Sequence, residues 1–246
     1  MTENFIKSPD FVENEKTKFL ARTYGWMSLA LLLSAVSAWI AAHSPAFTKI
    51  IWGISGTENA GTPVGFIILA VAEIALVWFL GAKIRKMKLS SVIISFIAYS
   101  IINGLTLSSI FFVYQLSSVA YCFLASAVMF AAMSIYGMKT KSSLNKAGKY
   151  LMMALVGLIA ISLANLLITL ITHTALSVLD WIISLATVVI FAGLTAYDSQ
   201  KILRAAEFSD GQDDYKKLSV YAALQIYLDF INIFLSLLRL FGKRRN

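Results

Sequence analysis

The stretch SVYAALQIYLDFINIFLSLLRLF, residues 219–241, is long enough to cross a membrane and carries an aspartate, Asp229, near its middle. A second apolar stretch, ATVVIFAGLTAYDSQKIL at residues 186–203, carries Asp198 near its end. An ionisable group inside a hydrophobic span costs about 2.5–3.5 kcal/mol on insertion scales, so such groups usually face a protein interior or a water path. We therefore interpret the two aspartates as the working part of a membrane protein that conducts or senses ions.

The composition indicates an integral membrane protein. Of the 246 residues, 59% are hydrophobic and only 14% are charged, and the mean hydropathy is +0.76. No soluble globular domain needs this balance. Apolar runs recur at lengths near the roughly 20 residues that a helix needs to cross the bilayer, without the alternating pattern of an outer-membrane barrel. The sequence predicts an all-α membrane fold.

The apolar runs predict seven transmembrane helices, at residues 23–42, 63–82, 90–113, 117–137, 149–172, 178–200 and 218–241. Residues 1–22 mix both charge signs and lack an apolar run with a small-residue cleavage site, so we interpret them as a cytoplasmic tail and not a signal peptide. The domain organisation expected is this tail, a single seven-helix membrane domain at 23–241, and a basic C-terminal tail at 242–246.

Basic residues alternate between the connections that join these spans. The N-terminal tail and the connections 83–89, 138–149 and 201–217 carry four each, whereas 43–62, 114–116 and 173–177 carry one, none and none. By the positive-inside rule, the N-terminus and the basic connections are cytoplasmic. The last span breaks the pattern, because Arg239, Lys243, Arg244 and Arg245 lie at its C-terminal end. Either it re-enters and returns, or it crosses fully because protein surrounds it.

The last span carries a continuous polar stripe. The stripe follows helical steps of 4, 4, 3, 4 and 3 through Tyr221, Gln225, Asp229, Asn232, Ser236 and Arg239. Shorter stripes of Ser, Thr, Asn and Tyr lie on the third, fifth and sixth spans, which indicates a shared polar interior. The alternative is that these hydroxyl and amide groups hold packed helices together, at about 0.6 kcal/mol per hydrogen bond.

Several other functions find no support in the sequence. The single cysteine, Cys122, excludes an intramolecular disulfide, and no CxxC or HExxH pattern is present, so we expect no resident cofactor. The net charge of +8 is spread over short connections, where it sets topology and does not indicate nucleic-acid binding. We interpret Asp180, Asp210, Asp213 and Asp214, at or beyond the span ends, as solvated charges.

The motifs of the spans resemble the Bax inhibitor-1 family, the transmembrane Bax-inhibitor-motif proteins, in its bacterial branch. The resemblance rests on Phe19 with Tyr24, Glu73, NGLTLSSIF at 103–111, TAYDSQKI at 195–202 and YLDFINIFLSLLRLFG at 227–242. It implies a fold in which six helices surround a central seventh. It also implies a pH-sensitive calcium leak in which Asp198 and Asp229 share a proton and act as sensor and gate.

The resemblance carries two further expectations. A basic residue at the cytoplasmic end of the second span is expected to latch onto Asp198; Arg85 is our choice, with Lys83 and Lys86 as alternatives. Some family members resemble regulators of a membrane-anchored AAA protease, so the alternative function is a regulatory protein that binds such a membrane partner. For either function, we expect a bacterial inner membrane with the N-terminus in the cytoplasm.

Two nearby carboxylates in a poorly solvated site cannot both ionise cheaply, and they titrate in coupled steps. We expect a shared proton to join the sixth and seventh spans and close the path, and deprotonation or a cation to favour opening. Two carboxylates are a sparse site, because calcium usually takes six to eight oxygens, so Asp198 and Asp229 are expected to bind it only transiently as it permeates. Further pore-lining candidates are Glu73, Asn103, Tyr221, Gln225 and Asn232.

Glu73 has two interpretations, as a third acidic group on the ion path or as an acid hydrogen-bonded to a neighbouring helix. An enzyme is not expected. A pair of aspartates sharing a proton is also the chemistry of intramembrane aspartyl proteases. Those enzymes place each aspartate in its own Gly-rich setting, and YLDF has no adjacent glycine.

Overall fold

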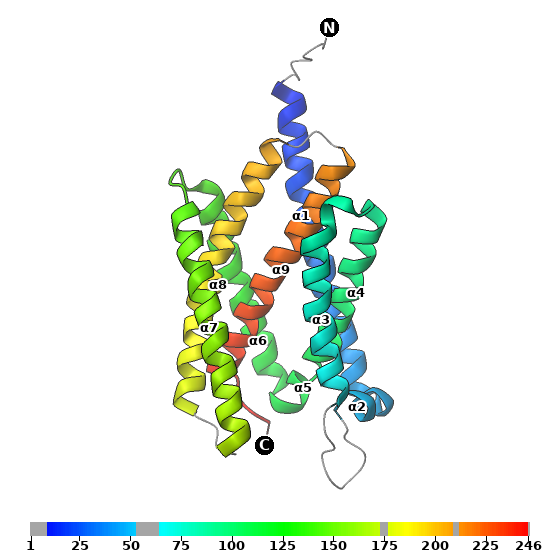
Figure 1. Cartoon of the computed structure of the whole chain (residues 1–246), viewed down its shortest axis with the longest axis vertical. Coiled ribbons are helices and arrows are strands. Elements are labelled where there is room, and N and C mark those ends of the chain that lie inside the picture. Colours follow the sequence, from blue (N-terminus) through cyan, green and yellow to red (C-terminus); the bar gives the residue numbers. More distant parts are fainter. Residues whose placement is uncertain (1–8, 53–63, 173–176, 209–211, 246) are drawn as a thin grey trace. The chain divides into compact units, whose positions relative to one another are not determined.

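A computed structural model of the chain describes residues 9–52, 64–172, 177–208 and 212–245. Within these ranges it contains no β-strand, only nine α-helices and a short 3-10 helix, η1 (Figure 1). The bounds are α1 Pro9–His43, α2 Pro45–Trp52, α3 Val64–Lys83, η1 Ile84–Lys86, α4 Leu89–Leu107, α5 Ile110–Val113, α6 Leu116–Lys139, α7 Asn145–Thr172, α8 Ser177–Glu207 and α9 Asp213–Phe241.

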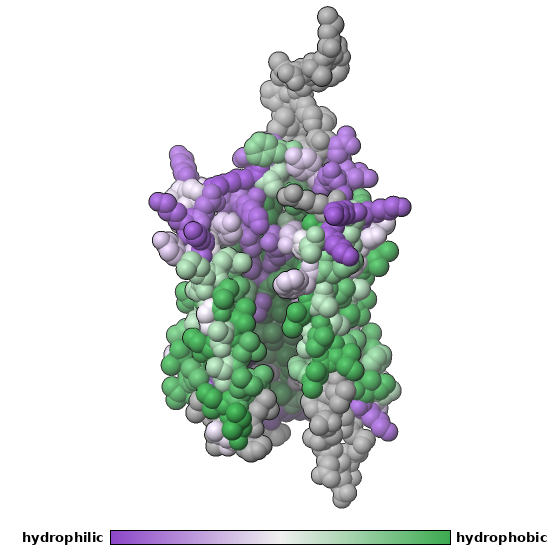
Figure 2. Space-filling model, viewed as in Figure 1, coloured by the Kyte–Doolittle hydropathy of each residue, from purple (hydrophilic) through white to green (hydrophobic). Residues whose placement is uncertain are grey.

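Seven helical segments in the described residues are long and apolar enough to cross a membrane. They are α1, α3, α4 continued through α5, α6, α7, α8 and α9, which correspond in order to the seven predicted spans. The all-α, seven-span fold is therefore confirmed. Figure 2 shows hydrophobic side chains along the exposed lengths of the helices and hydrophilic ones gathered mainly toward the upper end of the view, as expected of helices in a bilayer.

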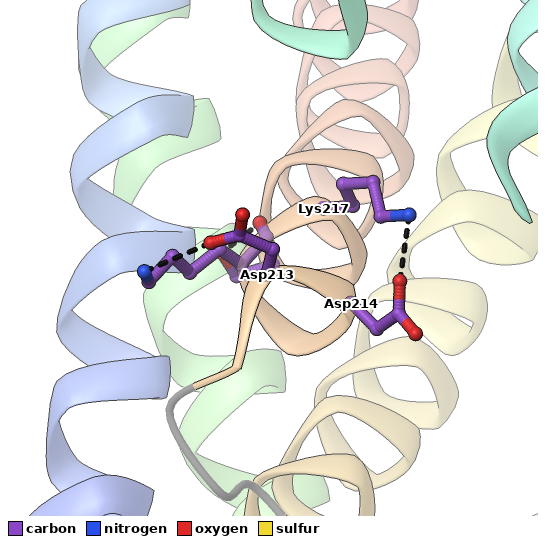
Figure 3. Close-up of polar contacts among 5 residues, drawn as sticks. Asp213, Asp214 and Lys217 are labelled. Carbon is purple, nitrogen blue, oxygen red and sulfur yellow. Dashed lines mark hydrogen bonds and ion pairs between the residues drawn. The ribbon is translucent and has the colours of Figure 1, made fainter. Parts of the chain in front are cut away.

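Five helices are longer than the apolar runs that predicted them, and α1, α8 and α9 extend farthest beyond those runs. The helix α1 begins at Pro9, inside the segment expected to be a tail, since proline is well tolerated in a first helical turn. The helix α8 continues to Glu207. The helix α9 begins at Asp213, where Asp213 and Asp214 complement the positive end of the helix dipole and pair with the lysines three residues later (Figure 3).

The third span is interrupted where the sequence predicted one helix. The helix α4 ends at Leu107, and α5 begins at Ile110. The hydroxyl of Ser108 donates to the Leu105 carbonyl oxygen at 2.6 Å, and the hydroxyl of Ser109 donates to the Thr106 carbonyl oxygen at 3.2 Å. Serine side chains that bond nearby backbone groups compete with the helical hydrogen bonds. The short helix α2 was not predicted at all.

The helices pack into two compact units. Unit 1 comprises residues 1–113 and 202–224, and unit 2 comprises residues 114–201 and 225–246. Both α8 and α9 therefore contribute one part to each unit. In unit 1, α4 packs against both α1 and α3. Its contact with α1 includes a 2.7 Å hydrogen bond from the Ser34 hydroxyl to the Ser100 carbonyl oxygen.

Unit 2 contains α6, α7, most of α8 and the last part of α9. The rings of Phe123 and Phe130 in α6 meet the Phe230 ring of α9 edge-on, at centroid distances of 5.2 and 5.8 Å. Close backbone contact between α6 and α8 occurs at Gly137, where a β-carbon would lie 2.7 Å from the carbonyl carbon of Ala196. Aromatic packing and a small residue thus bring α6 against both aspartate-bearing helices.

The last helix is the most buried of the spans. Of its apolar window 67% is buried, against 6% for α3 and 11% for α7. This burial agrees with the expectation that protein surrounds the polar-striped last helix. A helix with polar groups along one face needs protein around it, because hydrocarbon offers those groups no hydrogen-bond partner.

The course of α9 distinguishes the two topologies that the sequence left open. The helix is continuous from Asp213 to Phe241, with no re-entrant turn. Just after the helix ends, the backbone amide of Lys243 donates to the Ser118 hydroxyl at 3.1 Å. The backbone amide of Gln115 donates to the Lys243 carbonyl oxygen at 3.0 Å. The end of α9 therefore meets the first turn of α6, and the structure supports a full crossing.

Candidate functional site

Unit 2 brings Asp198 of α8 and Asp229 of α9 together. Their carboxyl groups are near enough for the charge of Asp198 to act on Asp229, and the Lys201 ammonium group acts on both. Asp229 is only 4% exposed, whereas Asp198 is half-buried and Lys201 is exposed. The two acids predicted from sequence therefore form a pair with one deeply buried member.

The buried member of the pair is incompletely hydrogen-bonded. The Oδ2 atom of Asp229 accepts no hydrogen bond from any residue that the structure describes. A buried polar atom without a partner costs about 1–3 kcal/mol, so such atoms are rare and usually have a functional cause. This oxygen is free to bind a proton, a water molecule or a cation.

The α8 segment around Asp198 is fixed by its neighbours. The hydroxyls of Ser199 and Ser134 lie 3.0 Å apart, joining α8 to α6. The Gln200 side chain donates to the Ser142 carbonyl oxygen and accepts from the Leu144 amide, both at 2.9 Å, which fastens α8 to the α6–α7 connection. Asp198 is therefore held on a rigid part of α8 while its carboxyl group interacts with α9.

Sequence reasoning missed these supporting residues. The signal was present in TAYDSQKI, where only the aspartate was assigned a role, although Ser199 and Gln200 are 0% and 6% exposed. Tyr197 packs over α7, where a β-carbon on Gly148 would lie 2.5 Å from its ring. A run of polar residues at the end of an apolar helix therefore marks tertiary contacts on several sides at once.

The two pore-lining candidates of unit 2 lie on the same helix as Asp229. The Asn232 amide nitrogen donates to the Leu228 carbonyl oxygen of its own helix at 2.8 Å, and the residue is half-buried. Gln225 is also half-buried. The donor of Asn232 is thus occupied within α9, and its amide oxygen lies on the polar stripe.

Glu73 forms a separate polar cluster in unit 1. Its Oε1 accepts from the Thr106 hydroxyl at 2.6 Å, and its Oε2 accepts from the Asn103 amide nitrogen at 3.3 Å. These bonds join α3 to α4. Of the two interpretations of Glu73, the structure supports the acid that is hydrogen-bonded to a neighbouring helix. Glu73 and Asn103 therefore meet each other, but they belong to a different unit from Asp198 and Asp229.

The remaining candidates lie at the end of α3 and beyond. The side chain of Arg85, the expected latch, lies outside the described residues; its backbone belongs to η1. Lys83, one alternative, has its ammonium group 5.2 Å from the centre of the Phe79 ring, a cation–π arrangement. Tyr221 lies beside α3, with its hydroxyl 3.5 Å from the β-carbon position of Gly81.

The acid pair offers few metal ligands. Among the described residues, no group of three or more His, Cys, Asp or Glu side chains could hold a metal ion. Calcium takes six to eight oxygens in protein sites, so two carboxyl groups require water and amide or backbone oxygens to complete a shell. The pair fits a passing cation better than a tightly bound one.

The sequence matches the family model described as Inhibitor of apoptosis-promoting Bax1 over residues 16–246. The chain belongs to the Bax inhibitor-1 family. It is 42% identical to the inner membrane protein YbhL of Escherichia coli strain K12, over 92% of each chain. It is 38% identical to an uncharacterized protein of Borreliella burgdorferi, over 94% of each chain. The resemblance drawn from the motifs is therefore confirmed.

Membership covers nearly the whole chain, so the family fold applies to both units. An uncharacterized protein of Rickettsia prowazekii is 36% identical over 93% of this chain and 91% of its own. With seven helices suited to crossing a bilayer, this Bax inhibitor-1 protein is a multi-pass membrane protein.

Proposed function

We propose that this protein is a pH-sensitive, calcium-permeable leak channel of a bacterial inner membrane, gated by protonation of Asp198 and Asp229. The observation that carries the proposal is the acid pair of unit 2, with Asp229 buried and one of its oxygens unpartnered. Placing an ionisable group in a membrane span is energetically unfavourable, so the groups found there usually have a function. The inner-membrane location follows YbhL.

The gating mechanism follows from the charge of the pair. At low pH, one proton held between the two carboxyl groups makes a hydrogen bond that joins α8 to α9. When pH rises and the proton leaves, two like charges face each other and repel, which separates the helices. Because Asp198 is fixed by Ser199 and Gln200, the movement falls on α9. Calcium flux is therefore expected to increase with pH.

Calcium chemistry also fits the deprotonated pair. Two ionised carboxylates offer hard oxygen ligands, and Asn232 adds an amide oxygen on the same face of α9. The shell is too sparse to hold calcium, so the ion is released again. Conduction requires this combination of sufficient attraction and easy exit.

The test is calcium flux into liposomes that contain the purified protein, between about pH 5 and about pH 8. Wild-type flux should rise with pH, by up to about tenfold per pH unit if one proton controls the gate. Asp198→Asn and Asp229→Asn should each make the flux independent of pH. The matched control is Asp180→Asn, on the exposed first turn of α8, which can still accept the 2.6 Å hydrogen bond from Asn165.

Flux that keeps its pH dependence in both aspartate variants would refute the gate. No flux above empty liposomes at any pH would refute the channel. That result would favour the alternative function, regulation of a membrane-anchored protease or another membrane partner. The acid pair would then be a structural hydrogen bond between helices.

A further inference from the structure

A groove of about 460 Å³ runs along unit 2 between α6 and the end of α9. Its floor is formed by Cys122, Ala125 and Met129 of α6 and by Leu237 and Phe241 of α9. It does not include Asp198 or Asp229, and it plays no part in the gate proposed above. The floor is apolar and open to one side, where a lipid chain has access.

The depth of the groove corresponds to one leaflet of a bilayer. Its lining on α6 extends from Ser117, in the first turn, to Met129. Twelve residues of helix rise about 18 Å at 1.5 Å per residue. Half of a hydrocarbon core of roughly 30 Å is about 15 Å. A single acyl chain that starts at the membrane interface would therefore end close to the end of the groove.

The mouth of the groove is polar and basic. It is lined by Gln115, which precedes α6, by Ser117 and Ser118 of α6, and by Lys243. Hydrogen bonds of the Lys243 main chain to Ser118 and Gln115 fix the basic residue at this position. Gly242 permits the close turn, because a β-carbon there would lie 2.7 Å from the ring of Tyr114.

The charge at the mouth is uncompensated. No residue lining the groove is acidic, and Lys243 is exposed and followed by Arg244 and Arg245. In the part of the chain that the structure describes, none of these three side chains forms a salt bridge. This is the end of α9 whose basic residues break the positive-inside pattern of the sequence. The exception is explained if an anion from the membrane neutralises them.

We propose that the groove binds one anionic phospholipid, with its phosphate at Lys243 and one acyl chain between α6 and α9. The apolar floor provides for the chain, and the basic mouth selects a headgroup of net negative charge over a zwitterionic one. A basic residue near the headgroups favours anionic lipid by about fivefold. Lys243 is the residue that determines this preference.

The test uses photoactivatable lipids in nanodiscs of phosphatidylcholine. A phosphatidylglycerol analogue and a phosphatidylcholine analogue, each with a diazirine in one acyl chain, are compared with the full-length protein, and cross-links are mapped by peptide mass spectrometry. The phosphatidylglycerol analogue should label the floor residues about fivefold more than the phosphatidylcholine analogue. Lys243→Gln should abolish this preference.

Two further variants separate the headgroup from the chain. Lys139→Gln removes the same charge from the other end of α6 and should leave floor labelling unchanged. Ala125→Phe fills the floor from an exposed position, so the protein should still fold while floor labelling falls for both analogues. Equal labelling by both analogues in the wild type, or an unchanged preference in Lys243→Gln, would overturn the proposal. So would cross-links from the groove to a second copy of the chain.

Discussion

Replacing Gly137 with alanine tests how tightly α6 and α8 must meet for Asp198 to be held in place. A β-carbon at Gly137 would overlap the Ala196 carbonyl oxygen and lie 2.7 and 2.8 Å from the carbonyl carbon and α-carbon of that residue. Real β-carbons essentially never approach closer than 3.0 Å, so the two helices would have to separate. Ala196 is only two residues before Asp198.

The free-energy cost of this overlap can be isolated by comparison with a replacement at Gly157, in α7 of the same unit. A β-carbon at Gly157 would meet nothing within 4 Å. Both replacements should stabilise their helix by about 1 kcal/mol, because alanine has a higher helix propensity than glycine in a helix interior. This gain cancels in the difference between the two variants, which leaves the cost of overpacking, about 1–3 kcal/mol. The atoms that would have to move belong to the backbone, so the cost cannot be avoided by a rotamer change.

The assay is thermal unfolding in detergent, followed with a thiol-reactive dye. The chain has one cysteine, Cys122, which is 6% exposed and becomes available to the dye as unit 2 unfolds. At about 2–4 °C per kcal/mol, Gly137→Ala should melt about 2–12 °C below Gly157→Ala. Equal melting temperatures for the two variants would refute the reasoning, because the α6–α8 contact would then tolerate a side chain.

Three further predictions concern the stability of the whole protein, measured as its free energy of unfolding or its melting temperature. Thr106→Val should lower the free energy of unfolding by about 1–3 kcal/mol, because it leaves Glu73 without its shortest hydrogen bond. Glu73→Gln should lower the melting temperature less than Thr106→Val does. Gln200→Leu should cost about 2 kcal/mol, at roughly 1 kcal/mol for each hydrogen bond that it loses. Faster hydrogen exchange at the Leu144 amide would show that the α6–α7 connection has been released. Lys217→Ala should change stability by less than about 0.5 kcal/mol, since its partner is solvated, and a clear loss would contradict this.

The fold followed from the sequence because a bilayer imposes a length on every span. Seven apolar runs became seven helical segments, and the polar stripe correctly marked the last of them as the most buried. The acid pair also followed, since an aspartate inside a span has few tolerable places other than beside a polar partner. In both cases the bilayer limits what the sequence can do, and this limit can be recognised without knowing which helices are in contact.

Features that depend on a particular neighbour could not be predicted. Glu73 illustrates this, because only the position of α4 shows that both of its oxygens already have donors. The supporting role of Gln200 likewise depends on the course of the α6–α7 connection. The break between α4 and α5 at Ser108–Ser109 arises from local side-chain hydrogen bonds that compete with the helical ones. A hydropathy pattern contains no information about such bonds.

The hydrogen bond between Lys243 and Ser118 also sets an order of assembly. It joins residues 125 apart, so unit 2 cannot close until residues 225–243 have been synthesised. At about 5–20 residues per second, α6 waits roughly 6–25 s in the membrane before α9 arrives. Asp198 precedes Asp229 by 31 residues, so for about 2–6 s of this interval it has no partner acid. The nascent protein therefore passes through a stage in which only one of the two aspartates of unit 2 is present.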